Sequence, residues 1–173
     1  EGLDTDSDFG QFFSVSWTLN KDWFTGRLSY ARSTFSVFAE SLTPLTDGWR
    51  AANFPAVADG LEVVDDSGDF KGVGFIFDFE NWLVVTEFTQ VDPGDSFFPP
   101  SDSYYISGGF RTDNGMIHLT YGADENEPNF GLTSGVPAGV DPGLDFLIAQ
   151  TQGLLQSNLE DTSFVTLGYK WDL

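Results

Sequence analysis

The sequence predicts an all-β fold, an antiparallel transmembrane β-barrel of about seven strands, and three observations carry this prediction. Aromatic and β-branched residues recur at every second position in several runs, which is the spacing that places them on one face of a strand. Short connections rich in turn-forming residues alternate with long, acidic connections. No apolar run is long enough for a transmembrane helix, and barrel strands do not need one because their apolar residues alternate with polar ones.

Four of the expected strands form two hairpins in the middle of the chain, over residues 72–79, 82–89, 104–111 and 116–121. Short turns at residues 80–81 and 112–115 close the two hairpins. The connection between the hairpins, residues 90–103, is long, acidic and proline-bearing. Outer-membrane barrels segregate short and long loops in this way, whereas a soluble sandwich has no reason to do so.

Three further strands are expected outside this central block, over residues 10–19, 23–32 and 163–173, and the second could extend through residue 38. Two more long loops are expected at residues 40–69 and 123–162, where the alternation is lost. The first could hold one helical turn near residues 49–53, and residues 142–159 have the spacing of a short amphipathic helix. All of these elements belong to a single barrel domain or to a fragment of one.

The odd strand number indicates an incomplete barrel. Single-chain bacterial barrels have an even number of strands, so that the first and last strands pair antiparallel. An isolated sheet would leave two open edges, which are costly in hydrocarbon. The chain opens on the acidic segment EGLDTDSD and not on a signal peptide. We therefore expect the 173 residues to be an internal or incomplete part of a larger barrel.

Composition narrows the class of protein. Aromatic residues make up 16% of the chain and there are 19 glycines, which favours an all-β chain. The net charge of −20, from 27 acidic and 7 basic residues, is opposite in sign to what a nucleic-acid binder needs. The chain has no cysteine, so neither disulfides nor cysteine-ligated metals are available.

If the apolar faces of the strands contact membrane lipid, the opposite faces line the lumen of the barrel. Charges on those faces could select solutes, because pores select through charge near their constriction. On the lipid side, Arg or Lys would cost about 2–4 kcal/mol at the membrane midplane. The alternative is that these charges form structural ion pairs with neighbouring strands. The candidate pore-lining residues are Arg27, Asp78, Glu87, Arg111, His118 and Lys170.

The loop over residues 40–69 is the candidate constriction element, because a connection this long is expected to be functional or folded inward. Its acids would then face basic strand residues across the channel. The alternative is a loop that caps the barrel from outside. The candidate constriction-loop residues are Asp59, Glu62, Asp65 and Asp66.

Aromatic residues near the strand ends are candidates for the girdles that mark the two membrane interfaces. In a soluble protein the same residues would be core residues. The candidates are Trp17, Trp23, Trp82, Tyr104 and Trp171.

Catalysis and metal binding have little support in the sequence. His118 is the single histidine, and no spacing supplies it with the serine and the acid that a nucleophilic site needs. The acidic strings at residues 92–95 and 124–127 lack the spacing of a calcium-binding EF-hand, which favours solvated loop charge. We expect no enzyme activity, no cofactor and no metal.

The central strands resemble the general porins of Gram-negative proteobacteria. The residues that carry the resemblance are Gly74, Asp78, Asn81, Trp82, Val84, Glu87, Phe88, Tyr105, Gly109, Phe110, Arg111 and Tyr121. Residues 166–173, TLGYKWDL, resemble a later strand of that family. Phe77 and Phe110 stand where the family usually has tyrosine, and the proline after the second hairpin turn is absent, which leaves the solute open.

The resemblance implies an outer-membrane channel for passive diffusion of small hydrophilic solutes or ions, often a homotrimer, without a cofactor. Membrane lipid and lipopolysaccharide are then the expected surroundings, and nucleic acid is not a partner. The alternative is a secreted, soluble β-sandwich that binds carbohydrate through exposed aromatic residues, because one strand face could be core and the other could face water.

Overall fold

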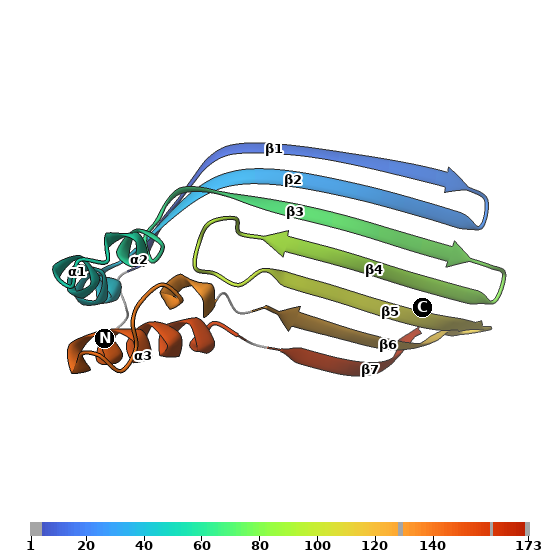
Figure 1. Ribbon diagram of the computed structural model, residues 1–173. Coiled ribbons are helices and arrows are strands. Elements are labelled where there is room, and N and C mark those ends of the chain that lie inside the picture. The colour runs from blue at the N-terminus through green and yellow to red at the C-terminus, as the bar shows by residue number, and fades with distance from the viewer. Residues whose placement is uncertain (1–4, 128–129, 160, 172–173) are drawn as a thin grey trace.

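Seven strands form one antiparallel sheet in which neighbours in sequence are neighbours in space (Figure 1). The computed structural model describes residues 5–127, 130–159 and 161–171. The strands are β1 (Thr5–Lys21), β2 (Phe24–Ala39), β3 (Val63–Asp78), β4 (Trp82–Asp92), β5 (Ser101–Thr112), β6 (Gly115–Asn126) and β7 (Thr162–Trp171). The prediction of an all-β, antiparallel fold with about seven strands is confirmed.

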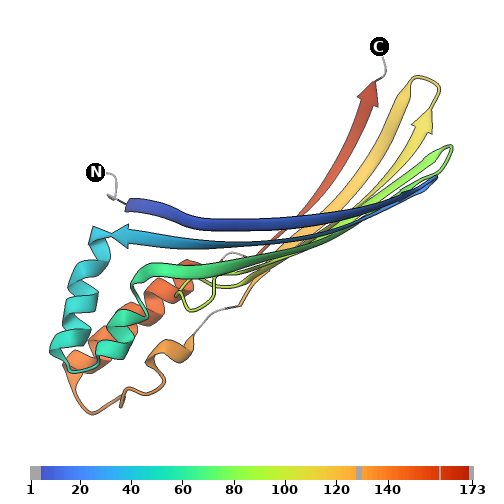
Figure 2. The same cartoon turned by 90° about the horizontal axis from the view of Figure 1, so that it is seen from above.

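The sheet is curved and open (Figure 2). In the described part of the chain, β1 pairs only with β2 and β7 pairs only with β6, so the two edge strands do not meet. The sheet therefore does not close into a barrel by itself.

Short turns connect the strands at one end of the sheet. Asp22 and Trp23 link β1 to β2, and Asp22 has a φ of 45°, a left-handed value that aspartate tolerates better than most residues. In the next hairpin the Phe79 amide donates a 2.8 Å hydrogen bond to the Trp82 carbonyl. The long connections all lie at the other end, as the sequence predicts.

The strands run further into the long connections than the alternation indicates. Residues 63–69 fall within an expected loop, but they belong to β3 and pair with β2. Residues 90–92, 101–103 and 123–126 likewise extend β4, β5 and β6. The segment VVDDSGD has no alternation of apolar residues, so its strand depends on tertiary contacts: pairing with β2 along the segment and burial of Val63 in the helical end.

The long connections contain helices rather than irregular loop. They are η1 (Glu40–Leu42), α1 (Thr43–Ala51), α2 (Pro55–Asp59), η2 (Phe130–Thr133) and α3 (Pro142–Ser157). Helix α3 confirms the amphipathic helix expected there, and Asp141 caps it by accepting hydrogen bonds from the amides of Gly143 and Leu144. The helical turn expected near residues 49–53 is confirmed in part, because α1 is helical through residue 51, but the helix begins earlier than expected and a second helix, α2, follows it. Both helices have proline in their first turns.

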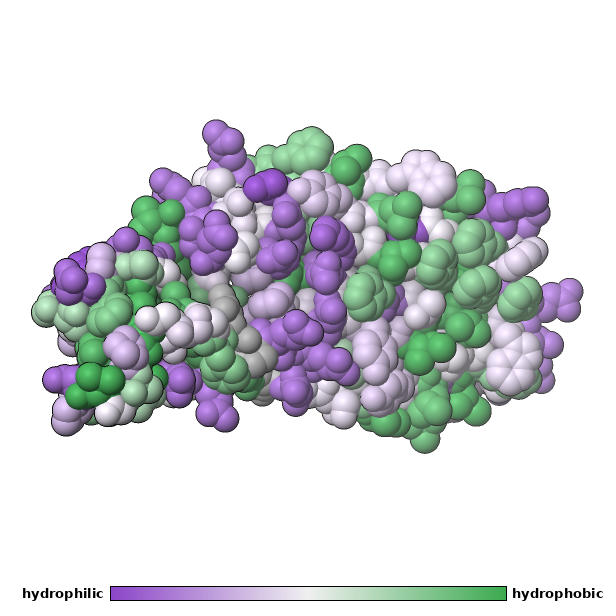
Figure 3. Space-filling view, viewed as in Figure 1, coloured by the Kyte–Doolittle hydropathy of each residue, from purple (hydrophilic) through white to green (hydrophobic). Residues whose placement is uncertain are grey.

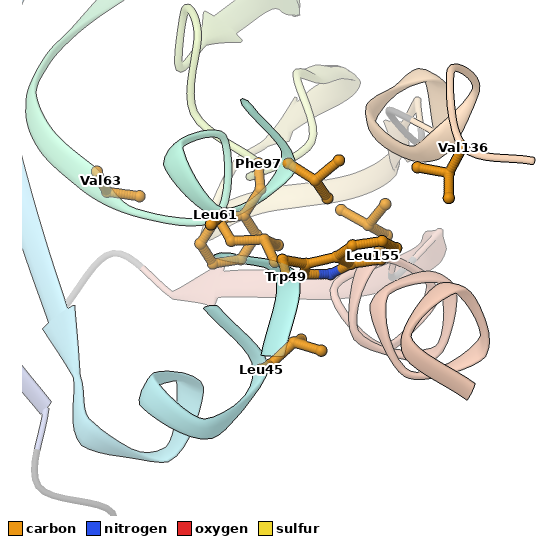
Figure 4. Close-up of a cluster of buried hydrophobic side chains, with 9 residues drawn as sticks. Leu45, Trp49, Leu61, Val63, Phe97, Val136 and Leu155 are labelled. Carbon is orange, nitrogen blue, oxygen red and sulfur yellow. The ribbon is translucent and has the colours of Figure 1, made fainter. Parts of the chain in front are cut away.

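The helices gather beyond the end of the sheet that is opposite the short turns, where they enclose a small apolar core (Figures 1 and 4). Leu45, Trp49, Val57, Ala58, Leu61, Val63, Phe97, Val136 and Leu155 form this helical core. Its members come from three connections that are far apart in sequence. The buried apolar cluster of this fold thus lies at one end of the sheet and not against the middle of either face.

Candidate functional site

The strand register separates the side chains of the sheet onto two chemically different faces. We call one the apolar face. It carries Val15, Trp17, Leu19, Leu28, Val73, Phe75, Phe77, Trp82, Val84, Phe88, Tyr104, Ile106, Phe110, Ile117, Leu119, Tyr121, Val165, Leu167, Tyr169 and Trp171. We call the opposite one the polar face, where serine, threonine and glycine predominate.

The apolar face is exposed although it is made of large side chains. Leu119, near the middle of β6, is 54% exposed, and Leu167 beside it on the edge strand β7 is 75% exposed. Figure 3 shows apolar side chains spread over the half of the sheet nearer the short turns. Contiguous apolar surface of this extent is rare on monomeric soluble proteins and marks an interface with another molecule or with a membrane.

From β3 to β6 the apolar face ends in a polar belt, whereas on β1 the exposed side chains of Val15 and Phe13 continue beside it. One cross-strand row of this belt consists of Lys71, Gln90, Asp102 and Glu125, which are paired strand by strand. The Lys71 ammonium donates to Gln90 Oε1 at 3.4 Å, and the Gln90 amide donates to Asp102 Oδ1 at 3.0 Å. In Figure 3 polar side chains separate the apolar region from the helical end.

The length of the apolar region can be measured along β5. Between Tyr104, next to the polar belt, and Phe110, near the short turns, the strand rises about 20 Å. A transmembrane β-strand crosses the hydrocarbon core with about 9–11 residues tilted by about 45°. The stretch from Tyr104 to Phe110 is shorter than such a span, and it approaches that length only when the residues at the turn end of β5 are included.

The five aromatic residues expected at the interfaces border this region on two sides. Trp17 and Tyr104 lie in one cross-strand row directly next to the polar belt. Trp82 and Trp171 lie on the apolar face toward the short turns. Trp23, in the β1–β2 turn, stacks on Phe79 with ring centroids 5.4 Å apart. None of the five belongs to the helical core.

All six candidate pore-lining residues project from the polar face. Arg27, Gly74 and Glu87 share one cross-strand row, which continues through Tyr105. The His118 imidazole lies over Gly168, where a side chain on residue 168 would clash with it. The register therefore groups these residues on one surface, as alternation predicts; their pore-lining role stays a prediction.

Two of the six form an ion pair. Arg111 contacts Asp78 at 2.7 Å and also donates to the carbonyl oxygen of Phe79 at 2.7 Å. These contacts hold the end of β3 against β5, across the tip of β4. Arg111 and Asp78 therefore form a structural ion pair between strands, which is the alternative that the sequence left open.

Arg27 and Glu87 have polar partners of another kind. Arg27 Nε donates to Ser16 Oγ at 3.2 Å, and the Tyr105 hydroxyl donates to Glu87 Oε2 at 3.2 Å. Neither charge has an ion-pair partner among the described residues. Their role toward a solute stays a prediction.

The candidate constriction acids lie at the helical end of the sheet. Arg50 contacts Glu62 at 2.8 Å and Asp59 at 3.1 Å, and its guanidinium holds the pKa of Glu62 below the usual range. Asp65 and Asp66 lie in β3, on the loop side of the polar belt. Partial burial, with Asp95 and Asp65 nearby, raises the pKa of Asp66. Inward folding of this segment stays a prediction because the sheet is open.

Sequence reasoning did not single out Tyr105, Asp124 and Phe164 as site residues, although all three lie on the polar face between β5 and β7. Tyr105 enters the sequence analysis only through the porin resemblance, Phe164 only as part of an expected strand, and Asp124 as part of an expected loop. Asp124 belongs to β6, where it accepts hydrogen bonds from Ser101 and Ser103, both at 2.7 Å. The two-residue alternation, extended to the full length of the strands, would have placed all three residues on the polar face.

Two further findings concern the described residues. No three of their His, Cys, Asp or Glu side chains are grouped so that they could hold a metal ion. None of their helices is both long and apolar enough to cross a membrane.

Comparison with known protein families finds no match to this chain, and searches of curated proteins and of solved structures find none either. The architecture itself is an open, antiparallel sheet with one apolar and one polar face and with helices at one end. The resemblance to general porins stays a prediction.

Proposed function

We propose that this sheet is part of the wall of a porin-like outer-membrane β-barrel, through which small hydrophilic solutes or ions diffuse passively. The observation that carries the proposal is the exposed apolar band of the sheet, with aromatic residues at both borders and a polar belt beyond one of them. Transmembrane barrels need such a band on the outside and small polar residues on the inside.

The two faces differ in side-chain size as well as in polarity. Aromatic and branched residues cover the apolar face, whereas the polar face has glycine at positions 72, 74, 109, 122 and 168. Small residues allow a sheet to curve around the face that carries them. A barrel built from this sheet would therefore have the polar face inside.

Closing the barrel requires additional strands. Because the seven strands alternate in direction, β1 and β7 run the same way and would pair parallel if they met. An odd number of further strands restores antiparallel pairing throughout, in agreement with the even strand numbers of bacterial barrels. Closure also pairs the backbone groups of both edges, which would be costly to leave open in hydrocarbon.

The membrane setting follows from the same surfaces. The apolar face would contact lipid, and the polar belt would lie at the level of lipid head groups or of lipopolysaccharide in a Gram-negative outer membrane. In a homotrimer, part of the apolar face would contact neighbouring subunits. No catalytic step belongs to this proposal.

The test is extraction followed by reconstitution. A porin-like barrel partitions into detergent and not into buffer, and it produces stepwise conductance in planar bilayers. A water-soluble protein without conductance overturns the proposal and favours the carbohydrate-binding sandwich. That alternative requires a second layer over the apolar face, and no described element of this chain supplies one.

A further inference from the structure

The polar face is hollowed between β4 and β7, on the side of the sheet toward the helices. This β4–β7 hollow has a volume of about 400 Å³ and is lined by Glu87, Ser103, Tyr105, Asp124, Thr162 and Phe164. It contains two carboxylates, two aromatic rings and several hydroxyl groups. No lysine or arginine is among its lining residues.

Phe164 is the unusual member of the hollow. Its ring lies on the polar face across Gly122, where any side chain at position 122 would clash with it. The ring is 52% exposed and belongs neither to the helical core nor to the apolar face. The ring therefore covers Gly122 on one side and remains open to the hollow on the other.

The two carboxylates are held in place by hydroxyl donors. Asp124 accepts from Ser101 and Ser103, and Glu87 accepts from the Tyr105 hydroxyl. Neither carboxylate has an ion-pair partner among the described residues. Both negative charges therefore remain uncompensated beside the rings.

The separation of the carboxylates favours a large cation over a metal ion. Glu87 is on β4 and Asp124 is on β6, two strands apart and offset by two residues along the strands, so their backbones are about 12 Å apart. A site for a single metal ion needs several ligands close together, and no three His, Cys, Asp or Glu side chains of the described residues are grouped in that way. An organic ammonium ion can lie between them and contact the aromatic rings with its alkyl groups.

We propose that the β4–β7 hollow is a weak binding site for small organic ammonium ions, in which Glu87 and Asp124 supply charge and Phe164 supplies an aromatic surface. This inference rests on the proposed function, since it names a solute class for the same channel wall. Affinity would be on the order of millimolar, because exposed ion pairs and cation–π contacts are individually weak. Weak binding suits a solute that must leave the site again.

The probe is choline, and its uncharged isostere 3,3-dimethylbutan-1-ol is the matched control ligand. Binding of both to the detergent-solubilised protein is followed by saturation-transfer NMR at low salt. Choline is expected to bind and the isostere is not. The double variant Glu87→Gln/Asp124→Asn, and separately Phe164→Leu, should each weaken choline binding by about fivefold or more.

The control variant is Asp92→Asn/Asp102→Asn, which removes the same charge from the opposite face of the sheet. In the double variant of the hollow, the amide oxygen introduced at position 124 can still accept from both serines, so the hollow keeps its packing. The proposed site is refuted if choline and its isostere bind equally well. It is also refuted if both double variants lose choline binding to the same extent.

The binding measurement needs no conductance, so the two proposals fail separately. A protein that conducts in bilayers but does not bind choline refutes the hollow and leaves the channel. A protein that binds choline in the hollow but never conducts refutes the channel and leaves the site.

Discussion

The indole nitrogen of Trp49 in α1 donates a 2.9 Å hydrogen bond to the Thr151 hydroxyl in α3, across 102 positions of sequence. Both residues are fully buried in the helical end of the protein. This bond joins two long connections that emerge from different hairpins. It therefore links these two connections within the packed unit that the helical core forms.

Thr151→Val should destabilise this unit by about 1–3 kcal/mol, because the buried indole N–H loses its acceptor while the side-chain shape is kept. Hydrogen exchange of the α1 and α3 amides measures the effect. Thr46→Val is the control, since Thr46 is also buried but bonds only to the Thr43 carbonyl of its own helix. Equal effects of both substitutions would show that the bond between the helices adds nothing.

Leu119→Arg and Thr120→Arg distinguish a lipid-facing sheet from a water-facing one. The two residues are neighbours on β6 and project from opposite faces. In a membrane, arginine at residue 119 should cost about 2–4 kcal/mol near the midplane, whereas arginine at residue 120 would point into a polar lumen. Denaturant unfolding in liposomes measures the difference. If position 119 tolerates arginine as well as position 120 does, the apolar face does not contact lipid.

Glu62→Gln should lower the stability of the helical end by about 0.2–1 kcal/mol at neutral pH, because both partners of the Arg50–Glu62 pair are partly exposed. The folded pKa of Glu62 is below its ordinary value. Its contribution is therefore present above the unfolded value of 4.5 and is lost as pH falls through the folded value. Thermal melts of both proteins should differ at neutral pH and converge as pH falls through the folded pKa of Glu62. A difference that persists in acid would assign the effect to packing.

Asp66→Asn should have the opposite effect on stability: it should stabilise the protein at neutral pH. Partial burial and the neighbouring Asp95 and Asp65 raise the pKa of Asp66, so its ionised form disfavours folding at neutral pH. This penalty disappears as pH falls below the unfolded value of 3.8. The amide variant should therefore melt higher than the parent protein at neutral pH and equally at low pH. Asp113→Asn, in a turn at the far end of the sheet, should leave the melt unchanged; a matching increase there would point to net charge.

The parts of the fold that the sequence predicts are those encoded by local alternation. Residues 72–79 and 104–111 alternate clearly, so their strands and the residues on each face follow directly. Residues 63–69 lack alternation, and their strand depends on pairing with β2. The contact between Trp49 and Thr151 depends on tertiary packing between distant connections, which periodicity does not encode.

For the candidate site, too, the sequence pattern does not predict contacts between distant residues. Parity alone places Arg111 and Asp78 on one face, but it does not pair them, because they belong to different hairpins and meet across the tip of β4. Parity also does not show that Arg27 bonds to Ser16 and not to a carboxylate. Which charges are paired can be read only from the folded sheet.

That distinction predicts how charge on the polar face acts on ion selectivity. Glu87→Gln should reduce cation preference and Arg27→Gln should increase it, because both charges lack an ion-pair partner among the described residues. The double variant Asp78→Asn/Arg111→Gln removes a neutral pair and should leave selectivity unchanged. Reversal potentials across bilayers under a KCl gradient measure these shifts, which should shrink as added salt shortens the Debye length from about 30 Å at 0.01 M to about 3 Å at 1 M. If the neutral pair shifts the reversal potential as much as Glu87→Gln does, charge pairing does not decide which residues the permeating ion senses.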